Sequence, residues 1–246
     1  MVDCTLYHLG MVSPFVDAVL GGDRRARPWI SLIPPMTQMP ESSLALMVDT
    51  LGRDLSSEIF HPATIEGLDV QALHRHLARC TASDEPVIIL TTALALQVLV
   101  ESLRGTPISL PRGSRLMLTG GFKGARSEIS EDALIDRSAV VLGLAREDIV
   151  AEYGMTELTS QAYGSPFKAA PWLRVRVIDP VTLKELPPGR CGLVAFFDLL
   201  NLDNISAILS SDLGTMDKTG GFQLAGRAPG APRRGCSLIA DEWGAS

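Results

Sequence analysis

Three short glycine-containing motifs in the second half of the chain carry the side chains best suited to chemistry. They are Tyr-Gly-Met-Thr-Glu at 153–157, Ser-Ser-Asp-Leu-Gly at 210–214 and Leu-Ala-Gly-Arg-Ala-Pro-Gly at 224–230. Glycine and small polar residues end helices and strands, so propensity alone does not explain this order. Carboxylate, hydroxyl and guanidinium groups can bind a hard cation, accept or donate hydrogen bonds and pair with phosphate. The order and spacing of the three motifs therefore indicate a functional site.

The first of these motifs follows one of several predicted strands. Short apolar runs predict buried strands at 85–90, at 115–121, which ends in two glycines, and at 148–154. Apolar residues at helical spacing predict helices at 41–55, 68–80, 91–103 and 128–144, the third entered through Thr92. This alternation predicts a mostly parallel sheet flanked by helices.

Ligands of such sheets bind beyond the carboxyl ends of the strands. Three polar loops qualify by this rule, and we expect them to line one crevice: Thr91-Thr92, 120–123 and 153–157. Lys123 in the second loop could contact a phosphate, although an exposed lysine is the simpler interpretation.

The pattern changes after Pro171 to short alternating runs interrupted by glycine and proline, which predict antiparallel strands. The expected fold class is α/β, a mostly parallel sheet flanked by helices and followed by a small antiparallel β subdomain. The expected domains are an α/β core at 1–170, the β subdomain at 171–227 and a hinge or C-terminal tail at 228–246.

Composition excludes several classes of protein. The 246 residues, 46% of them hydrophobic, can form a substantial core. The net charge of -6 argues against nucleic acid as the main partner, because phosphate backbones require a basic surface. The four cysteines lack metal-ligand spacing and suit a reducing compartment. The first residues do not resemble a signal peptide, and no apolar run predicts a membrane span, so we expect a cytoplasmic protein.

The order of the three motifs resembles that of the adenylate-forming enzymes, the superfamily of acyl-CoA ligases. "YGMTE", "SSDLG" and "LAGRAPG" are similar to three ordered motifs of that superfamily. "SLIPPMTQMPESSLALMV", "LTGGFKG" and "RGCSL" look more like the acyl-protein synthetases of bacterial bioluminescence. The resemblance covers most of the chain and implies a ligase that uses ATP and Mg²⁺ to convert a carboxylic acid, here a fatty acid, into an acyl-adenylate.

The resemblance also implies roles for individual residues. Glu157 would help to hold Mg²⁺, and the Thr156 hydroxyl would donate to a phosphate oxygen. Asp212 would accept from the ribose diol, and Arg227 would meet ribose or phosphate. The other residues expected at the nucleotide are Gly120, Gly121, Tyr153, which would stack near adenine, and Gly154. The simpler alternatives are a capping or solvent-facing role for Glu157 and a turn role for Asp212.

Cys236 is the cysteine whose position corresponds to the acyl acceptor of the acyl-protein synthetases. Arg233 and Arg234 precede it and would lower its pKa, which favours the thiolate. Its alternative role is that of a small buried residue. Cys4, Cys80 and Cys191 lie in or beside apolar patterns and are expected in the core. An acyl reductase is the partner protein that the resemblance implies.

One family motif is missing. The Ser/Thr-Gly-rich loop that wraps the β- and γ-phosphates of ATP is not found in the sequence, and the chain resembles an N-terminally truncated member. Two alternatives to the acyl-protein synthetase function therefore stay open. One is a non-catalytic remnant that binds nucleotide, an acyl group or a partner, and the other is an aryl- or acyl-CoA ligase.

Overall fold

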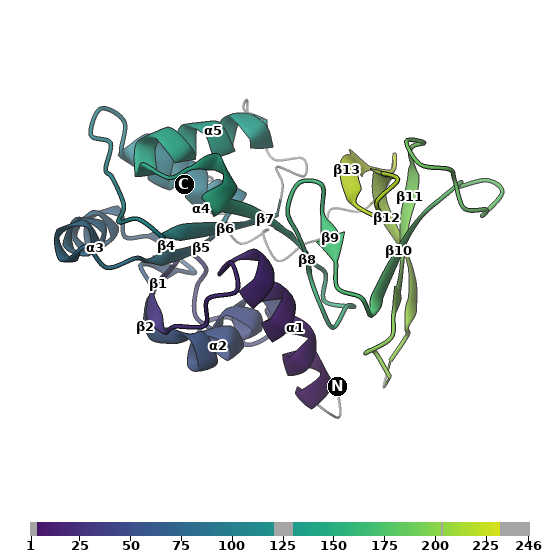
Figure 1. Cartoon of the computed structure of the whole chain (residues 1–246), viewed down its shortest axis with the longest axis horizontal. Helices are drawn as coiled ribbons and strands as arrows, with labels where there is room; N and C mark the ends of the chain where they lie inside the picture. Colours follow the sequence, from purple (N-terminus) through teal and green to yellow (C-terminus); the bar gives the residue numbers. More distant parts are fainter. Residues whose placement is uncertain (1–3, 121–129, 203, 232–246) are drawn as a thin grey trace. The chain divides into compact units, whose positions relative to one another are not determined.

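The computed structural model describes residues 4–120, 130–202 and 204–231. By its internal contacts the chain forms two compact units (Figure 1). Of the described residues, one unit holds 19–120 and 130–150, and the other combines 4–18 with 151–202 and 204–231. The chain passes from one unit to the other within strand β7 (Ile149–Tyr153).

The unit at 19–150 is built on parallel strands in the order β2-β1-β5-β6. The strands are β1 (Arg27–Ser31), β2 (Ser56–Phe60), β5 (Ile88–Thr92) and β6 (Arg115–Thr119). A two-stranded hairpin of β3 (Ala63–Thr64) and β4 (Gly67–Leu68) lies apart from them, and a 3-10 turn, η1 (Arg146–Asp148), leads into β7. The parallel arrangement confirms the α/β class predicted from the alternating pattern.

Four helices cover this sheet, with α4 and α5 on one side and α2 on the other (Figure 1). They are α2 (Ser43–Leu55), α3 (Val70–Ser83), α4 (Ala93–Ser102) and α5 (Glu131–Leu142). Ser42, Asp69, Thr92 and Ser130 cap their first turns by accepting a backbone N–H. Leucines from α3, α4 and α5 pack with alternate residues of β1, β5 and β6 in one buried cluster. The predicted helices, including the entry through Thr92, are confirmed.

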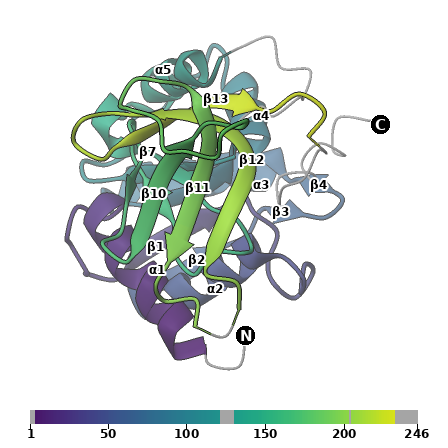
Figure 2. The ribbon, with the colours of Figure 1, turned by 90° about the vertical axis from the view of Figure 1, so that its right-hand side faces the viewer.

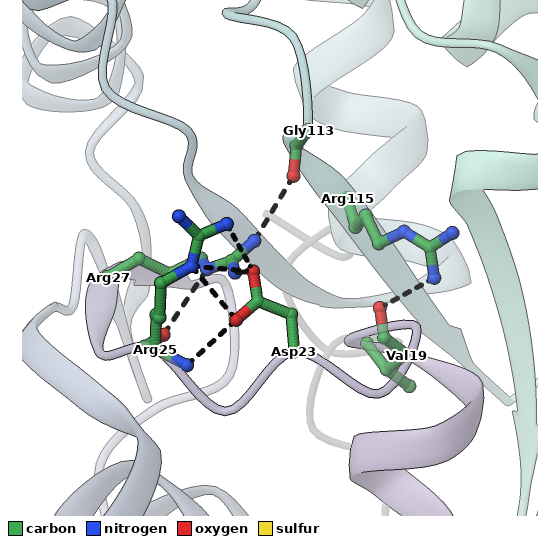
Figure 3. Close-up of polar contacts among 6 residues, drawn as sticks. All are labelled: Val19, Asp23, Arg25, Arg27, Gly113 and Arg115. Carbon is green, nitrogen blue, oxygen red and sulfur yellow. Dashed lines mark hydrogen bonds and ion pairs between the residues drawn. The ribbon is translucent and has the colours of Figure 1, made fainter.

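An arginine and aspartate network holds the segment before β1 (Figure 3). Asp23 accepts from the guanidinium groups of Arg25 and Arg27, and these bonds hold the pKa of its carboxyl well below the usual range. Arg27 also donates to the Gly113 carbonyl, and Arg115 donates to that of Val19. The network therefore ties the start of the parallel unit to the loop before β6.

The second unit is mainly antiparallel. Its four-stranded sheet has the order β10-β11-β12-β13, and Figure 2 shows β10, β11 and β12 side by side. The elements of this unit are α1 (Cys4–Ala18), β8 (Ala162–Tyr163), β9 (Lys168–Ala169), β10 (Leu173–Ile178), β11 (Gly192–Asp198), β12 (Ala207–Met216) and β13 (Phe222–Arg227). Its core combines aromatic rings with Leu158, Leu173 and Val194. The predicted antiparallel sheet is thus present.

The predicted domain boundary at 170 stays a prediction, and the two compact units divide the chain at other positions. Strands β8 and β9 extend β7 as an antiparallel ladder, and α1 contacts β8, so residues 151–170 and the first 18 residues group with the antiparallel sheet. Several elements were not expected from the sequence, among them the helix α1, the strand β1 and the strand β12. The tail at 232–246 lies outside the described residues.

Candidate nucleotide site

Three predicted site residues, one from each motif, meet in the antiparallel unit. The Tyr153 hydroxyl donates to Asp212 Oδ2 at 2.8 Å, and Arg227 Nε lies 3.3 Å from Asp212 Oδ1. Asp212 and Arg227 are register partners on β12 and β13, and Tyr153 ends β7. Chain folding therefore gathers these side chains around one carboxylate that is only 5% exposed.

Tyr153 is fixed by both its hydroxyl and its ring. Its ring lies against those of Phe167, Phe196 and Phe222, with centroids 5.9, 5.6 and 5.7 Å away. Burial, followed by the negative charge of Asp212, raises the pKa of Tyr153 above its ordinary value. The hydroxyl therefore keeps its proton and serves as a donor to Asp212. In the structure the neighbours of the Tyr153 ring are phenylalanine rings. Stacking of Tyr153 on adenine stays a prediction.

Asp212 lies in the middle of a strand, which corrects the alternative interpretation of this residue as part of a turn. Pairing of β12 with β11 on one side and β13 on the other imposes the extended backbone. Gly214, two residues on, permits this close packing, because a Cβ there would lie 2.5 Å from the Gln223 carbonyl oxygen. The glycine of the second motif is thus explained by strand packing.

The Tyr-Gly-Met-Thr-Glu motif leaves β7 as a turn with exposed polar side chains. The Leu158 N–H donates to the Met155 carbonyl at 3.1 Å, and Thr156 and Glu157 are both exposed. Gly154 is packed tightly, because a Cβ there would lie 2.6 Å from Glu152 Oε1. The turn can therefore present a hydroxyl and a carboxylate to a ligand, although the roles predicted for Thr156, Glu157 and Gly154 stay predictions.

Sequence reasoning missed two residues that hold this turn. Asp198 accepts from Thr159, and the Asn201 side chain donates to the Glu157 carbonyl at 2.9 Å. Both residues are buried at the end of β11 and in the loop after it. In the sequence these residues are part of "DLLN" at the end of an apolar run. This pattern is the same as that of an ordinary strand that ends in polar residues.

The remaining predicted residues are scattered along the chain, and three of them lie outside the described residues. Gly120 follows β6 in the parallel unit, and its φ of 68° favours glycine. Gly121 and Cys236 lie outside the described residues, as does Lys123. Cys80 is buried as expected, whereas Cys191 is exposed and lies directly before β11, outside the core.

The donor chemistry of the turn fits a magnesium ion shared with a nucleotide. In the described part of the chain, no three or more His, Cys, Asp or Glu side chains gather as a metal site. Mg²⁺ commonly takes one or two protein carboxylates and completes its shell with phosphate oxygens and water. Glu157 could supply such a carboxylate. A two-oxygen acceptor such as Asp212 likewise matches the two hydroxyl donors of a ribose diol.

Among the described helices, none is both long and apolar enough to cross a bilayer.

Solved structures show which class of protein has this fold. ATP-bound MatB from Rhodopseudomonas palustris superimposes with a TM-score of 0.60 at 18% identity, over 87% of this chain and 42% of that one. The amide bond synthetase McbA from Marinactinospora thermotolerans gives 0.63 at 13% identity, over 90% and 44%. O-succinylbenzoate coenzyme A synthetase from Bacillus subtilis, in complex with AMP, gives 0.58 at 15% identity, over 91% and 45%. The fold is that of the adenylate-forming enzymes.

The family model of the acyl-protein synthetase LuxE matches residues 59–243, and the chain belongs to that family. A long-chain-fatty-acid–luciferin-component ligase from Aliivibrio fischeri is 21% identical over 156 residues, which cover 60% of this chain and 41% of the relative. The chain thus spans less than half the length of the relatives it matches. The family resemblance inferred from the motifs is confirmed.

Proposed function

We propose that this chain carries the adenylation site of a ligase that activates a fatty acid with ATP and passes the acyl group to a protein thiol. The contact of Tyr153, Asp212 and Arg227 carries the proposal, because it joins the three motifs around one acceptor. Membership of the acyl-protein synthetase family and the named activity of the Aliivibrio relative support the fatty acid as substrate. The partner protein is proposed to be an acyl reductase.

The reaction has two steps. A carboxylate oxygen of the acid attacks the α-phosphorus of ATP, the bond to pyrophosphate breaks, and acyl-adenylate forms. A thiolate then attacks the acyl carbonyl and AMP leaves. The first step depends on positioning and charge neutralisation more than on a protein nucleophile. In this proposal Asp212 orients the ribose, Thr156 donates to a phosphate oxygen, and Glu157 contributes an oxygen ligand to Mg²⁺.

The Glu157→Gln variant tests the role of the turn. We expect fatty-acid-dependent exchange of labelled pyrophosphate into ATP to fall by roughly 100- to 1000-fold, as for loss of one electrostatic contact in a transition state. Binding of AMP without Mg²⁺ should stay unchanged. Glu185→Gln is the matched control, since that glutamate is exposed and pairs with Arg176. Equal exchange by the two variants would remove Glu157 from the proposed site.

The Cys236→Ser variant tests the acyl acceptor. After incubation with ATP, Mg²⁺ and labelled fatty acid, we expect the wild type to carry a hydroxylamine-sensitive label that this variant lacks. Cys191→Ser is the control, because Cys191 is a free and exposed thiol. Exchange of pyrophosphate should persist in both variants, since the thiol acts only after adenylation. Undiminished labelling of Cys236→Ser would place the acceptor elsewhere, and transfer to coenzyme A would favour the acyl-CoA ligase alternative.

A further inference from the structure

Asp198 is a buried carboxylate at the end of β11 with hydrogen bonds to a distant part of the chain. It is fully buried, and its Oδ2 accepts from the Thr159 backbone N–H at 2.7 Å and from the Thr159 hydroxyl at 2.8 Å. Its Oδ1 accepts from the Leu200 N–H at 3.0 Å. A buried charge without partners is costly, whereas three donors compensate this one. Asp198 therefore fixes the chain two residues beyond Glu157.

Asn201 holds the same turn through the backbone of Glu157 itself. Its Nδ2 donates to the Glu157 carbonyl at 2.9 Å and to the Ile205 carbonyl at 3.2 Å, and the residue is 7% exposed. Ser206 in turn donates through its hydroxyl to the Asn201 carbonyl at 2.9 Å. The loop after β11 is thus closed on itself and bonded to the turn.

These contacts matter because the Glu157 side chain is exposed. An exposed carboxylate is directed by the position of its backbone, and the backbone at 157–159 is held by Asn201 and Asp198. Helix α1 also packs closely against the end of the turn, because a Cβ at Gly10 would lie 2.6 Å from the Thr159 carbonyl oxygen.

We propose that Asp198 and Asn201 are positioning residues that hold the turn carrying Thr156 and Glu157 in the geometry needed for Mg²⁺-dependent adenylation. The inference rests on the proposed function. Neither residue contacts the nucleotide in this account, and both act through the backbone of the turn. We define the clamp as Asp198, Asn201 and their hydrogen bonds to residues 157–159. Loss of the clamp should therefore raise the Mg²⁺ concentration that adenylation requires and leave nucleotide binding at Asp212 unchanged.

The Asn201→Asp variant breaks the clamp with a minimal change of shape, because it places a carboxylate oxygen against the Glu157 carbonyl. Asn204→Asp is the matched control, with the same chemical change at an exposed position of the same loop. We expect Asn201→Asp to raise the Mg²⁺ concentration for half-maximal pyrophosphate exchange by roughly tenfold, the order of the cost of one broken amide–carbonyl hydrogen bond. Binding of AMP without Mg²⁺ should stay within about twofold of the wild type, because Asp212 and its partners are untouched.

Amide hydrogen exchange over residues 154–160 gives a second readout that needs no activity. It should accelerate in Asn201→Asp and in Asp198→Asn, and stay at the wild-type rate in Asn204→Asp. Equal Mg²⁺ dependence of Asn201→Asp and Asn204→Asp, or a parallel loss of AMP binding, would overturn the positioning role. A wild type without pyrophosphate exchange would contradict the proposed function and this role together, and unchanged amide exchange would separately show that the clamp does not hold the turn.

Discussion

Replacing Asp212 by alanine is expected to lower the affinity for ATP by roughly 100-fold, because two charge-assisted hydrogen bonds to the ribose diol are lost. Pyrophosphate exchange should fall at least as far. Asp212 is also bonded to Tyr153 and paired with Arg227, so the Asp212→Asn variant should accompany it as a change that keeps the shape of the side chain. Isothermal titration with ATP measures the effect.

Comparison of ATP with its 2′,3′-dideoxy analogue isolates the role of Asp212 in binding the ribose diol. The wild type should prefer ATP, and both Asp212 variants should bind the two nucleotides equally. Asp217→Asn is the control, an exposed aspartate in the turn between β12 and β13 that bonds to Thr219. A wild type that binds both nucleotides equally would show that Asp212 is only a structural partner of Tyr153 and Arg227.

The Phe222→Ala variant is expected to destabilise the antiparallel unit by about 3 to 5 kcal/mol, the usual cost of removing a buried aromatic side chain. Phe222 is fully buried and contacts the rings of Tyr153, Phe167 and Phe196. Its loss leaves a cavity beside the tyrosine that orients Asp212. Denaturant unfolding gives the change in free energy, and the affinity for ATP should fall as well because Tyr153 is no longer fixed.

Phe197→Ala provides the comparison for Phe222→Ala. Phe197 follows Phe196 on β11, but its side chain lies on the opposite face of the sheet and is 47% exposed. We expect its removal to cost less than about 1 kcal/mol, as for most exposed positions. Similar losses of stability in the two variants would mean that the aromatic cluster does not form the core of this unit.

The parallel unit could be predicted from the sequence because its signals are local. Ser42 and Thr92 precede apolar residues at helical spacing, and each caps the helix that follows. The strand at Ile88–Thr92 is apolar on both faces, as expected of a parallel strand with helices on each side. Local propensity and tertiary packing agree in these elements.

The antiparallel unit was harder to predict because its structure depends on distant partners. Strand β12 contains "SSDLG", a sequence typical of loops, and becomes a strand only through pairing with β11 and β13. Helix α1 contains Pro14 and apolar residues on all sides, so it lacks a clear amphipathic pattern. The contact of Gly10 with Thr159 depends on the tertiary fold.

The candidate site could be predicted in part. The motif order singled out Tyr153, Asp212 and Arg227, which are separated along the chain and meet in the structure, while their roles at a nucleotide stay predictions. Asp198 and Asn201 have no such signal, since a polar residue after an apolar strand usually faces water. Their burial is explained by hydrogen bonds that form only in the folded chain, to Thr159 and Leu200 for Asp198 and to the Glu157 and Ile205 carbonyls for Asn201.

Fatty-acid-dependent exchange of labelled pyrophosphate into ATP by this chain with Mg²⁺ tests the central claim most directly. The proposal predicts exchange by the wild type that is strongly reduced in both Glu157→Gln and Asp212→Ala. A folded, monodisperse wild type that shows no exchange with short, medium or long acids would contradict the ligase function. Binding of nucleotide in that case would leave a binding module as the function of this chain.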